Sequence, residues 1–337
     1  MKALVYTGPD DLELRDAETP VASPGEQLIK IDRVGICGSD MHAYLGHDER
    51  RPAPLILGHE AAGVIVGGPR EGERVTVNPL VTNPESWACQ EGRDNLCPDR
   101  QIISMPPREG AFAEYLAMPE TNLITVPDHA SLDHAALAEP LACGWHAVRL
   151  AKRALHDGGE NTRALVLGGG AIGLGAALSL IAQGLSDVTL LEPNAPRRAA
   201  IAASAEFPLI DLPDLDQAGF FDLVIDGVGF KATRATASAH AKPGGVIMHI
   251  GLGQNTGGLD IRRMTLQEIT FIGTYTYTAQ DFSDTAQAIF DGRLGALDWT
   301  QTRPLSDGAG AITDIQAGTV AATKILLDPT AKEIKPQ

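Results

Sequence analysis

One glycine-rich segment constrains the fold of this chain more than any other part of its sequence. Residues 163–183, RALVLGGGAIGLGAALSLIAQ, join an apolar β-rich run to an apolar helical run through three consecutive glycines. Gly168, Gly170 and Gly173 have the spacing G-x-G-x-x-G, which allows a tight turn, close approach of a phosphate to the backbone, and close packing of helix on strand. The segment therefore predicts a strand, a turn and a helix whose first N–H groups bind a pyrophosphate.

An acidic residue at the end of the next predicted strand extends this prediction to a whole dinucleotide. Glu192 closes the strand-like run DVTLLE, where a carboxylate accepts hydrogen bonds from a ribose diol. The same carboxylate would repel a 2′-phosphate, so we expect NAD rather than NADP, although Arg197 and Arg198 follow closely enough to keep NADP open. The cofactor residues predicted in this part of the chain are Gly168, Gly170, Ala171, Ile172, Gly173, Glu192 and Arg197.

The chain divides into a β-rich part and a part in which strands and helices alternate. Its 337 residues suggest two domains, at about 150 residues per domain. Up to about residue 130, short runs rich in Val, Ile and Leu are separated by Gly, Pro and Asp. From about residue 133, β-like runs alternate with helical ones, and the tail after about residue 273 is mixed. We expect an α/β chain in which a doubly wound parallel sheet is inserted into a β-rich domain.

Composition narrows the classes of partner and compartment. The formal net charge of -16 disfavours nucleic acid and anionic membranes as partners, and we interpret it as the charge that keeps an acidic protein in solution. The first residues, MKALVYTGPDDL, lack the features of a signal peptide, and the uncharged run 164–185 opens with a β-rich stretch and three glycines, so we expect a cytoplasmic protein. The four cysteines, Cys37, Cys89, Cys97 and Cys143, are expected to be reduced, either as metal ligands or as buried thiols.

Metal-ligating residue types occur in three glycine-containing segments of the chain. Cys37 lies in VGICGSDMHAYLG, His59 and Glu60 lie in ILGHEAAG, and Glu139 lies in ALAEPLACG. A thiolate, an imidazole and carboxylates suit Zn²⁺, which accepts S, N and O ligands in tetrahedral geometry and keeps a position for water or substrate in catalytic sites. A lone Cys or His is usually a packing residue, but these four residues together predict one catalytic zinc.

The motifs GICGSDxH, GHExxG and EPL, followed by the glycine turn, resemble the zinc-containing medium-chain dehydrogenases. The resemblance covers essentially the whole chain and is closest to the polyol branch, which includes sorbitol, threonine and butanediol dehydrogenases. It implies zinc on Cys37, His59 and Glu60, with Glu139 as a ligand directly or through water. It also implies homodimers or homotetramers, and a groES-like catalytic domain at 1–141 and 274–337 split around a Rossmann domain at 142–273.

One lobe departs from the pattern of this family. Many members carry a structural zinc on four cysteines, and the corresponding segment here is NPLVTNPESWACQEGRDNLCP. Cys89 and Cys97 are present, but Asn83 and Ser86 stand at the first two positions. Because two thiolates alone cannot complete a tetrahedral site, we predict no structural zinc.

The resemblance also implies how the proton and the hydride move. Zinc lowers the pKa of the substrate hydroxyl, and the carbon then releases hydride to the nicotinamide. Ser39 passes the proton through the cofactor ribose to His42, whose type suits a step near neutral pH, although His42 is equally compatible with a structural role. Asp40 is expected to bind a ligating imidazole rather than substrate.

Further cofactor contacts come from the resemblance alone. It places Val228 and Gly229 near the adenosine, and Ile250 and Gly251 near the nicotinamide. Some sorbitol dehydrogenases carry an Arg before the Tyr that matches Tyr277, and Thr276 stands there in this chain. That difference weakens an assignment of sorbitol itself.

The predicted function is zinc-dependent oxidation, with NAD, of a secondary alcohol in a polyol, diol or sugar-derived substrate. Alternatives on the same fold are an NADP-dependent enzyme, a dehydrogenase of phosphorylated polyols that uses Arg50 and Arg51, and a zinc-free quinone or enoyl reductase. A non-catalytic NAD-binding protein is the alternative from another class. The ligand set disfavours the last two, and no motif specifies the substrate, because pocket shape decides it.

Overall fold

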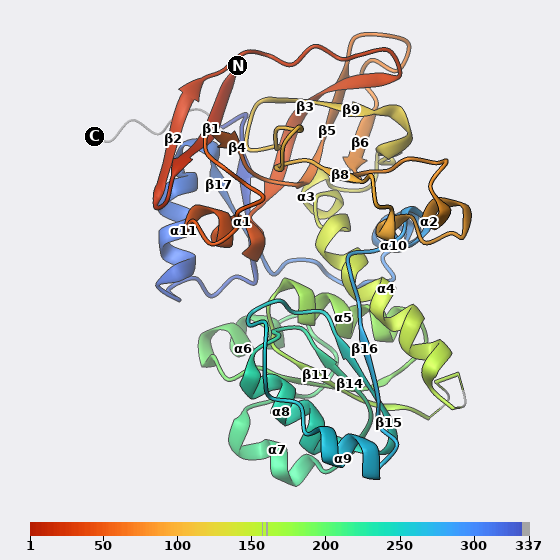
Figure 1. Ribbon diagram of the computed structural model, residues 1–337. Coiled ribbons are helices and arrows are strands. Elements are labelled where there is room, and N and C mark those ends of the chain that lie inside the picture. Colours follow the sequence, from red (N-terminus) through yellow and green to blue (C-terminus); the bar gives the residue numbers. More distant parts are fainter. Residues whose placement is uncertain (157, 160, 332–337) are drawn as a thin grey trace. The chain divides into compact units, whose positions relative to one another are not determined.

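The computed structural model of the chain describes residues 1–156, 158–159 and 161–331. The chain forms two compact units (Figure 1). Unit 1 contains Met1–Glu139, Thr278–Asp291 and the chain from Thr300 onward, and unit 2 contains Pro140–Tyr277 and Gly292–Trp299. The domain limits inferred from the sequence, 1–141, 142–273 and 274–337, remain a prediction.

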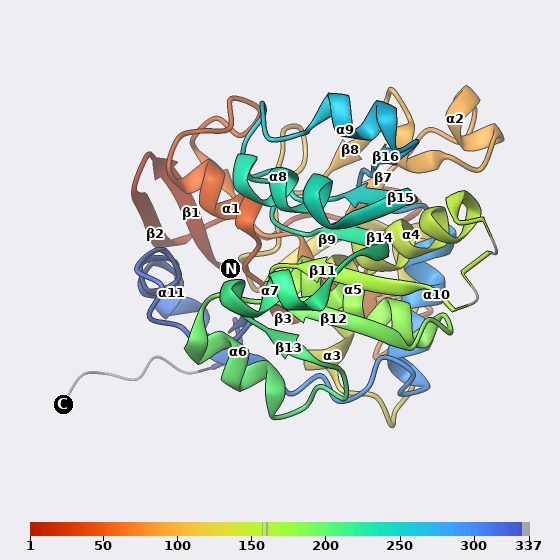
Figure 2. The same cartoon turned by 90° about the horizontal axis from the view of Figure 1, so that it is seen from below.

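Unit 2 is built on a parallel sheet. Within the described residues the sheet has six strands in the order β13-β12-β11-β14-β15-β16, and every neighbouring pair is parallel (Figure 2). The order reverses direction beside β11, which is the arrangement of a doubly wound, Rossmann-type sheet. The strands are β11 (Arg163–Leu167), β12 (Asp187–Leu191), β13 (Leu209–Ile210), β14 (Phe221–Asp226), β15 (Ala241–His249) and β16 (Thr270–Gly273).

Helices alternate with these strands along the chain, as the sequence pattern predicts. The central strands β11 and β14 are almost continuously buried, which is typical of parallel strands covered on both faces. Their core includes Leu165, Leu167, Phe221 and Val224. The helices are α4 (Ala138–Ala154), which begins in unit 1, α5 (Ala171–Ala182), α6 (Ala195–Ala202), α7 (Leu212–Ala218), α8 (Lys231–His240) and α9 (Ile261–Leu266).

Unit 1 is rich in antiparallel strands. Its largest sheet, as far as the chain is described, has seven strands, with β10-β6-β5-β3-β18-β17 in order and β9 also paired to β3. Smaller sheets are formed by β2-β1-β4 and by β7-β8. The strands are β1 (Lys2–Gly8), β2 (Asp11–Asp16), β3 (Glu26–Gly35), β4 (Leu55–Ile56), β5 (Glu60–Val66), β6 (Arg74–Val77), β7 (Leu80–Val81), β8 (Gln101–Ile102), β9 (Tyr115–Pro119), β10 (Leu123–Thr125), β17 (Thr300–Pro304) and β18 (Lys324–Asp328).

Two strands of this sheet come from the end of the chain. β18 pairs antiparallel with β3 and parallel with β17, so the C-terminal segment completes a sheet that the first residues begin. Alternating inward residues of these strands form one core that includes Ile29, Ile31, Ile65, Ile325 and Leu327. The helices of the unit are α1 (Gly38–Tyr44), α2 (Trp87–Gln90), α3 (Leu132–Ala135), α10 (Ala279–Phe290) and α11 (Gly308–Gln316).

The helices that the structure describes include none that is both long and apolar enough to cross a membrane. The uncharged run 164–185, which resembles a membrane segment by composition, is instead divided between β11, the glycine turn and α5. The predicted fold class, a doubly wound parallel sheet together with a β-rich part, is confirmed.

Candidate functional site: a metal centre and a dinucleotide turn

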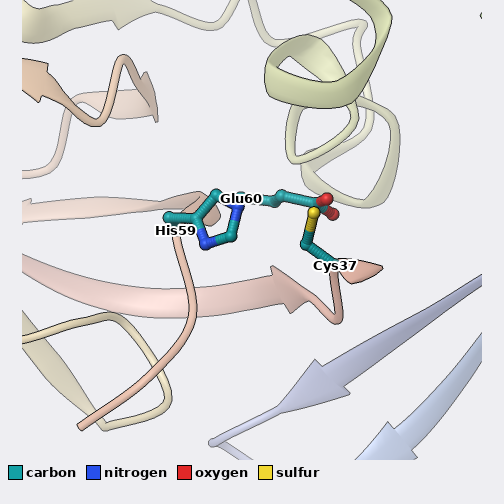
Figure 3. A group of neighbouring side chains, drawn as sticks. All are labelled: Cys37, His59 and Glu60. Atoms are coloured by element: carbon teal, nitrogen blue, oxygen red, sulfur yellow. The ribbon is translucent and has the colours of Figure 1, made fainter. Parts of the chain in front are cut away.

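Three of the four predicted metal ligands gather in unit 1 (Figure 3). One ligand atom from each of Cys37, His59 and Glu60 lies within 4.8 Å of the other two. His59 and Glu60 are buried and Cys37 is half-buried. A thiol, an imidazole and a carboxylate at this spacing suit a zinc ion. Across the described part of the chain, no other group of three or more His, Cys, Asp or Glu residues meets this spacing.

The pairing of β3 with β5 explains why residues far apart in sequence meet here. Gly35, the last residue of β3, pairs with Glu60, the first residue of β5. The chain then turns away from the sheet, and Cys37 becomes the residue that precedes α1. A side chain at Gly35 would overlap the carboxylate of Glu60, so glycine allows this carboxylate to keep its position. The strand register thus brings Cys37 next to the His59–Glu60 pair.

Asp40 connects the two segments that carry the donors. Its Oδ2 accepts a hydrogen bond from the backbone N–H of Cys37 at 3.0 Å, and its Oδ1 accepts one from the N–H of Gly58 at 3.2 Å. Burial raises the pKa of Asp40, but His59, Arg51 and the backbone outweigh this effect and lower it to about 2. Asp40 is therefore a buried anion that fixes the Cys37 and His59 segments to each other.

His59 faces this anion through one ring nitrogen. Nδ1 lies 3.4 Å from Asp40 Oδ1, an ion-pair distance without the alignment of a hydrogen bond, which leaves Nε2 for a metal. Burial lowers the pKa of His59, but the charges of Asp40 and Cys37 outweigh burial and raise the pKa well above its ordinary value. A metal ion would therefore displace a proton from this imidazole.

Glu60 has a partner that sequence reasoning did not include. Lys324, the first residue of β18, donates a hydrogen bond from Nζ to Glu60 Oε1 at 2.6 Å and another to the carbonyl of Ile36 at 2.9 Å. Burial lowers the pKa of Lys324, but Glu60 and Cys37 outweigh this and raise it, so the ammonium is charged. The other carboxylate oxygen of Glu60, Oε2, is buried and has no hydrogen-bond partner among the described residues.

The other residues predicted for the chemistry lie around this group. Glu139 is buried in the first turn of α4 and interacts electrostatically with Lys324, but within the described residues it is not one of the converging donors. Ser39 is half-buried in α1, and its carbonyl accepts a hydrogen bond from Arg51 at 2.6 Å. His42 is exposed on the same helix, with its ring 6.4 Å from that of His47.

In unit 2, the glycine turn follows β11 directly. Gly168 has a φ of +95°, which favours glycine, and a side chain at Gly173 would overlap the carbonyl of Gly168. A Cβ at Gly170, the residue that precedes α5, would meet no atom within 4 Å. The first and third glycines are therefore required by the fold, whereas the space beside Gly170 suits a bound phosphate at the start of α5. Ala171 and Ile172 form the first turn of that helix.

Glu192 follows the last residue of β12, and its buried carboxylate forms hydrogen bonds with the backbone of the glycine turn. Oε2 accepts a hydrogen bond from the N–H of Gly169 at 2.8 Å, and Oε1 accepts one from the N–H of Asn194 at 2.7 Å. Arg197 Nη1 lies 3.6 Å from Oε2, and Arg198 donates to the carbonyl of Glu192 at 2.6 Å. The side chain of Glu192 is only 4% exposed, so its predicted contact with ribose remains a prediction.

A second buried carboxylate, that of Asp226, binds the backbone near the remaining residues that the sequence predicts to contact the cofactor. Asp226, at the end of β14, accepts hydrogen bonds at Oδ1 from the N–H groups of Val228 and Gly229, at 3.0 and 2.8 Å. Its carbonyl accepts from Ile250 and Gly251 at 3.0 and 3.1 Å. These four residues, the glycine turn and Glu192 all follow the carboxyl ends of parallel strands, where doubly wound sheets bind their ligands.

The lobe that departs from the family pattern is held by polar contacts. The N–H of Asn83 lies 3.4 Å from Cys97 Sγ, and Asn83 Nδ2 donates to Asp99 at 3.1 Å. Ser86 Oγ accepts from the N–H of Cys89 at 3.3 Å. Burial raises the pKa of Cys97, but hydrogen bonds with Ser86 and the backbone at Asn83 outweigh it and lower the pKa. Cys37, Cys89, Cys97 and Cys143 form no disulfide with one another in the part of the chain that the structure describes.

Two family models match successive parts of the chain. Residues 23–128 match the alcohol dehydrogenase GroES-like domain, and residues 171–291 match the zinc-binding dehydrogenase domain. The chain is also 33% identical to L-galactonate-5-dehydrogenase of Escherichia coli (strain K12), over 88% of this chain and 89% of the relative. It is 32% identical to sorbitol dehydrogenase of Bacillus subtilis (strain 168), over 82% of each chain.

A solved alcohol dehydrogenase of Escherichia coli CFT073, in complex with NADH, has the same fold. It superposes with a TM-score of 0.86 at 25% identity, over 97% of this chain and 99% of that one. Another solved structure, whose fold matches that of this chain about equally well, is bound to NADP. The chain thus belongs to the zinc-containing medium-chain dehydrogenase family, in the polyol dehydrogenase branch. It is a zinc-dependent alcohol or polyol dehydrogenase that uses a nicotinamide cofactor, as the sequence predicts.

Sequence reasoning missed two residues that support the site. Lys324 lies 264 positions from its partner Glu60, and no local pattern links β18 to β5. Asp226 closes the buried strand FDLVID, and an acid at the end of an apolar run is the same signal that identified Glu192. That signal was available for Asp226, whereas none was available for Lys324.

Proposed function

We propose that the chain oxidises a secondary hydroxyl of a polyol or a sugar acid with NAD, using one zinc ion held by Cys37, His59 and Glu60, with Glu139 as a further ligand directly or through water. The convergence of the thiol, the imidazole and the carboxylate within 4.8 Å carries this proposal. The similarity to dehydrogenases of L-galactonate and sorbitol supports the substrate class. The replacement of two lobe cysteines by Asn83 and Ser86 supports a single zinc per chain.

The bound zinc supplies Lewis-acid chemistry, which makes a hydroxyl group more acidic. The residues of the chain then have distinct tasks. Asp40 fixes the orientation of His59 and of the loop that carries Cys37. Ser39, whose backbone carbonyl is bound by Arg51, and exposed His42 are the two residues of the chain that relay the hydroxyl proton to solvent, with Ser39 giving up its own proton as it takes up the new one. In unit 2, the N–H groups at the start of α5 hold the pyrophosphate, which orients the cofactor for hydride transfer.

The preference for NAD over NADP is part of the proposal. Glu192 lies beside the glycine turn, and a carboxylate there would repel the 2′-phosphate of a dinucleotide bound at that turn. Arg197 is the residue that could offset this repulsion, but its guanidinium already lies beside Glu192. We therefore expect activity with NADP to be at least about tenfold below that with NAD in kcat/KM, which corresponds to ~1.4 kcal/mol.

A direct test is to follow the reduction of NAD and of NADP by absorbance over a panel of polyols, diols and sugar acids. The proposal expects NADH formation with at least one secondary alcohol, and a Glu192→Ala variant that discriminates less against NADP. Phosphorylated polyols in the same panel test the alternative that Arg50 and Arg51 bind a phosphate. No turnover with any substrate, together with tight NADH binding, would instead favour a non-catalytic NAD-binding protein. The homodimer or homotetramer and the cytoplasmic location remain predictions.

A further inference from the structure

A buried lysine, Lys324, contacts one of the predicted metal donors, Glu60. Lys324 and Glu60 have side chains that are 4% and 0% exposed, and Nζ lies 2.6 Å from Oε1. Nζ also donates to the carbonyl of Ile36, the residue before Cys37. Removing one partner of such a buried pair leaves an uncompensated charge, so the pair is a fixed feature of the unit rather than a surface contact.

The contact with Lys324 gives the two carboxylate oxygens of Glu60 different surroundings. Oε1 is bound to the ammonium, whereas Oε2 is buried without a partner in the described part of the chain. An unpaired buried oxygen is costly unless a ligand satisfies it. Gly35 leaves the space that Oε2 occupies, because a side chain there would overlap this oxygen. Oε2 is therefore the oxygen of Glu60 whose bonding capacity a metal ion could satisfy.

The ammonium also acts on the other donors. Lys324 interacts electrostatically with Cys37 and Glu139 as well as with Glu60. A zinc ion at Cys37, His59 and Glu60 would share these anionic groups with the ammonium, and two cations near the same anions oppose each other in a buried site. Lys324 would consequently limit how much negative charge these donors could give to a bound metal.

We propose that Lys324 is a positioning residue of the metal site: it holds one oxygen of Glu60 away from the zinc and offsets part of the donor charge. This inference rests on the zinc site of the proposed function. The expected effects on binding and on turnover have opposite signs. Without the ammonium, zinc binds more tightly, because both oxygens of Glu60 become available and the repulsion between cations is lost. Turnover decreases, because a metal with more donor charge polarises the substrate less.

The test compares neutral and charged replacements of this lysine. Lys324→Gln keeps a hydrogen-bond donor without the charge, Lys324→Met removes both, and Lys324→Arg keeps the charge. Arg33→Gln is the matched control, because Arg33 on β3 pairs with Asp328 on β18 at 3.1 Å, and none of its described ion pairs is with a metal donor. Zinc alone is titrated into metal-free protein in competition with a chromogenic chelator. Cobalt in place of zinc reports the coordination number through its visible absorption.

We expect zinc to bind Lys324→Gln or Lys324→Met about tenfold more tightly than the wild-type protein, a typical size for coupling between two sites. Weaker cobalt absorption should accompany this, as a four-coordinate site becomes five-coordinate. Lys324→Arg and Arg33→Gln should bind zinc as the wild type does. In a Glu60→Gln background, the effect of Lys324→Gln should shrink.

Equal or weaker zinc binding by the neutral variants would overturn the role of Lys324 while leaving the zinc site intact. A wild-type chain whose zinc binding does not depend on Cys37 would overturn the zinc site itself, and with it this inference. If one neutral variant does not fold, the other decides the question, because both remove the charge. A purely structural lysine would change the unfolding temperature of metal-free and zinc-loaded protein equally and would leave the affinity unchanged.

Discussion

At the scale of single residues, Asp40 and His59 form the electrostatic centre of the metal site. Asp40 is fully buried, with a pKa of about 2, and binds the backbone on both sides of the donors. A carboxylate behind a ligating imidazole orients the ring and increases its basicity. The raised pKa of His59 shows the same effect in terms of proton binding. We therefore expect Asp40 to increase the affinity for a metal held by Cys37 and His59 without being a ligand itself.

Replacing Asp40 should weaken zinc binding. In Asp40→Asn the hydrogen bonds to Cys37 and Gly58 lose their charged acceptor, and His59 loses its ion pair. We expect the dissociation constant for zinc to increase about 10–100-fold, as for other residues that support a metal ligand. Asp48→Asn is a suitable control, because Asp48 pairs with Arg50 and Arg51 rather than with a donor. Equal affinities in the two variants would contradict this role of Asp40.

Zinc affinity should also depend on pH in a definite direction. The folded pKa of His59 is raised, so protonated His59 stabilises the metal-free protein fully below its unfolded pKa, and this stabilisation is lost as the pH rises through the folded value. Zinc must displace that proton, so its affinity should increase with pH by about tenfold per unit for each proton released. Calorimetric titrations in buffers of different ionisation enthalpy count the protons. No proton release at neutral pH would contradict the raised pKa.

At the scale of elements, the glycines of the turn have different roles. Gly173 is needed for the packing of the turn, whereas Gly170 leaves open space in which we expect the cofactor to bind. Gly173→Ala places a methyl group against the carbonyl of Gly168, whereas Gly170→Ala places one in open space. We expect Gly173→Ala to destabilise unit 2 by ~2 kcal/mol, as for an overpacked core position. Gly170→Ala should leave stability within about 0.5 kcal/mol of the wild type.

The two alanine variants should therefore have different defects: Gly173→Ala should lose stability, and Gly170→Ala should lose affinity for NADH. Gly170→Ala should weaken NADH binding by about tenfold, because its methyl group occupies the space of the pyrophosphate. Thermal unfolding and titration of NADH fluorescence separate the two effects. If Gly170→Ala bound NADH as well as the wild type, the phosphate would not lie against this turn.

The sequence predicted those elements whose signals are local. The strand, turn and helix around Gly168 follow from adjacent residues, and the GICGSD and GHE motifs predict the three side chains that the structure brings together, whereas Glu139 of the EPL motif is not part of that group in the described residues. Lys324 could not be found in this way, because its charge is explained only by a strand pairing that joins the two ends of the chain. The inward orientation of Glu192 was also not predictable, since a ribose ligand and a backbone partner select the same residue type.

At the scale of the whole molecule, the two chemical tasks belong to different units. The converging metal donors lie in unit 1, and the glycine turn with its supporting carboxylates lies in unit 2. Removal of zinc by a chelator should therefore abolish turnover but leave the dissociation constant for NADH close to that of the zinc-loaded protein. Fluorescence titration before and after chelation checks this expectation. A parallel loss of NADH binding would show that the metal site also maintains the dinucleotide site.

In the proposed function, Cys37, His59 and Glu60 hold a zinc ion that the reaction requires. The most direct measurement is the zinc content per chain together with NADH formation, for the wild type, Cys37→Ser and the control Cys89→Ser. We predict one zinc per chain and turnover in the wild type and in Cys89→Ser, and loss of both in Cys37→Ser. Unchanged turnover in Cys37→Ser would contradict this account of the site.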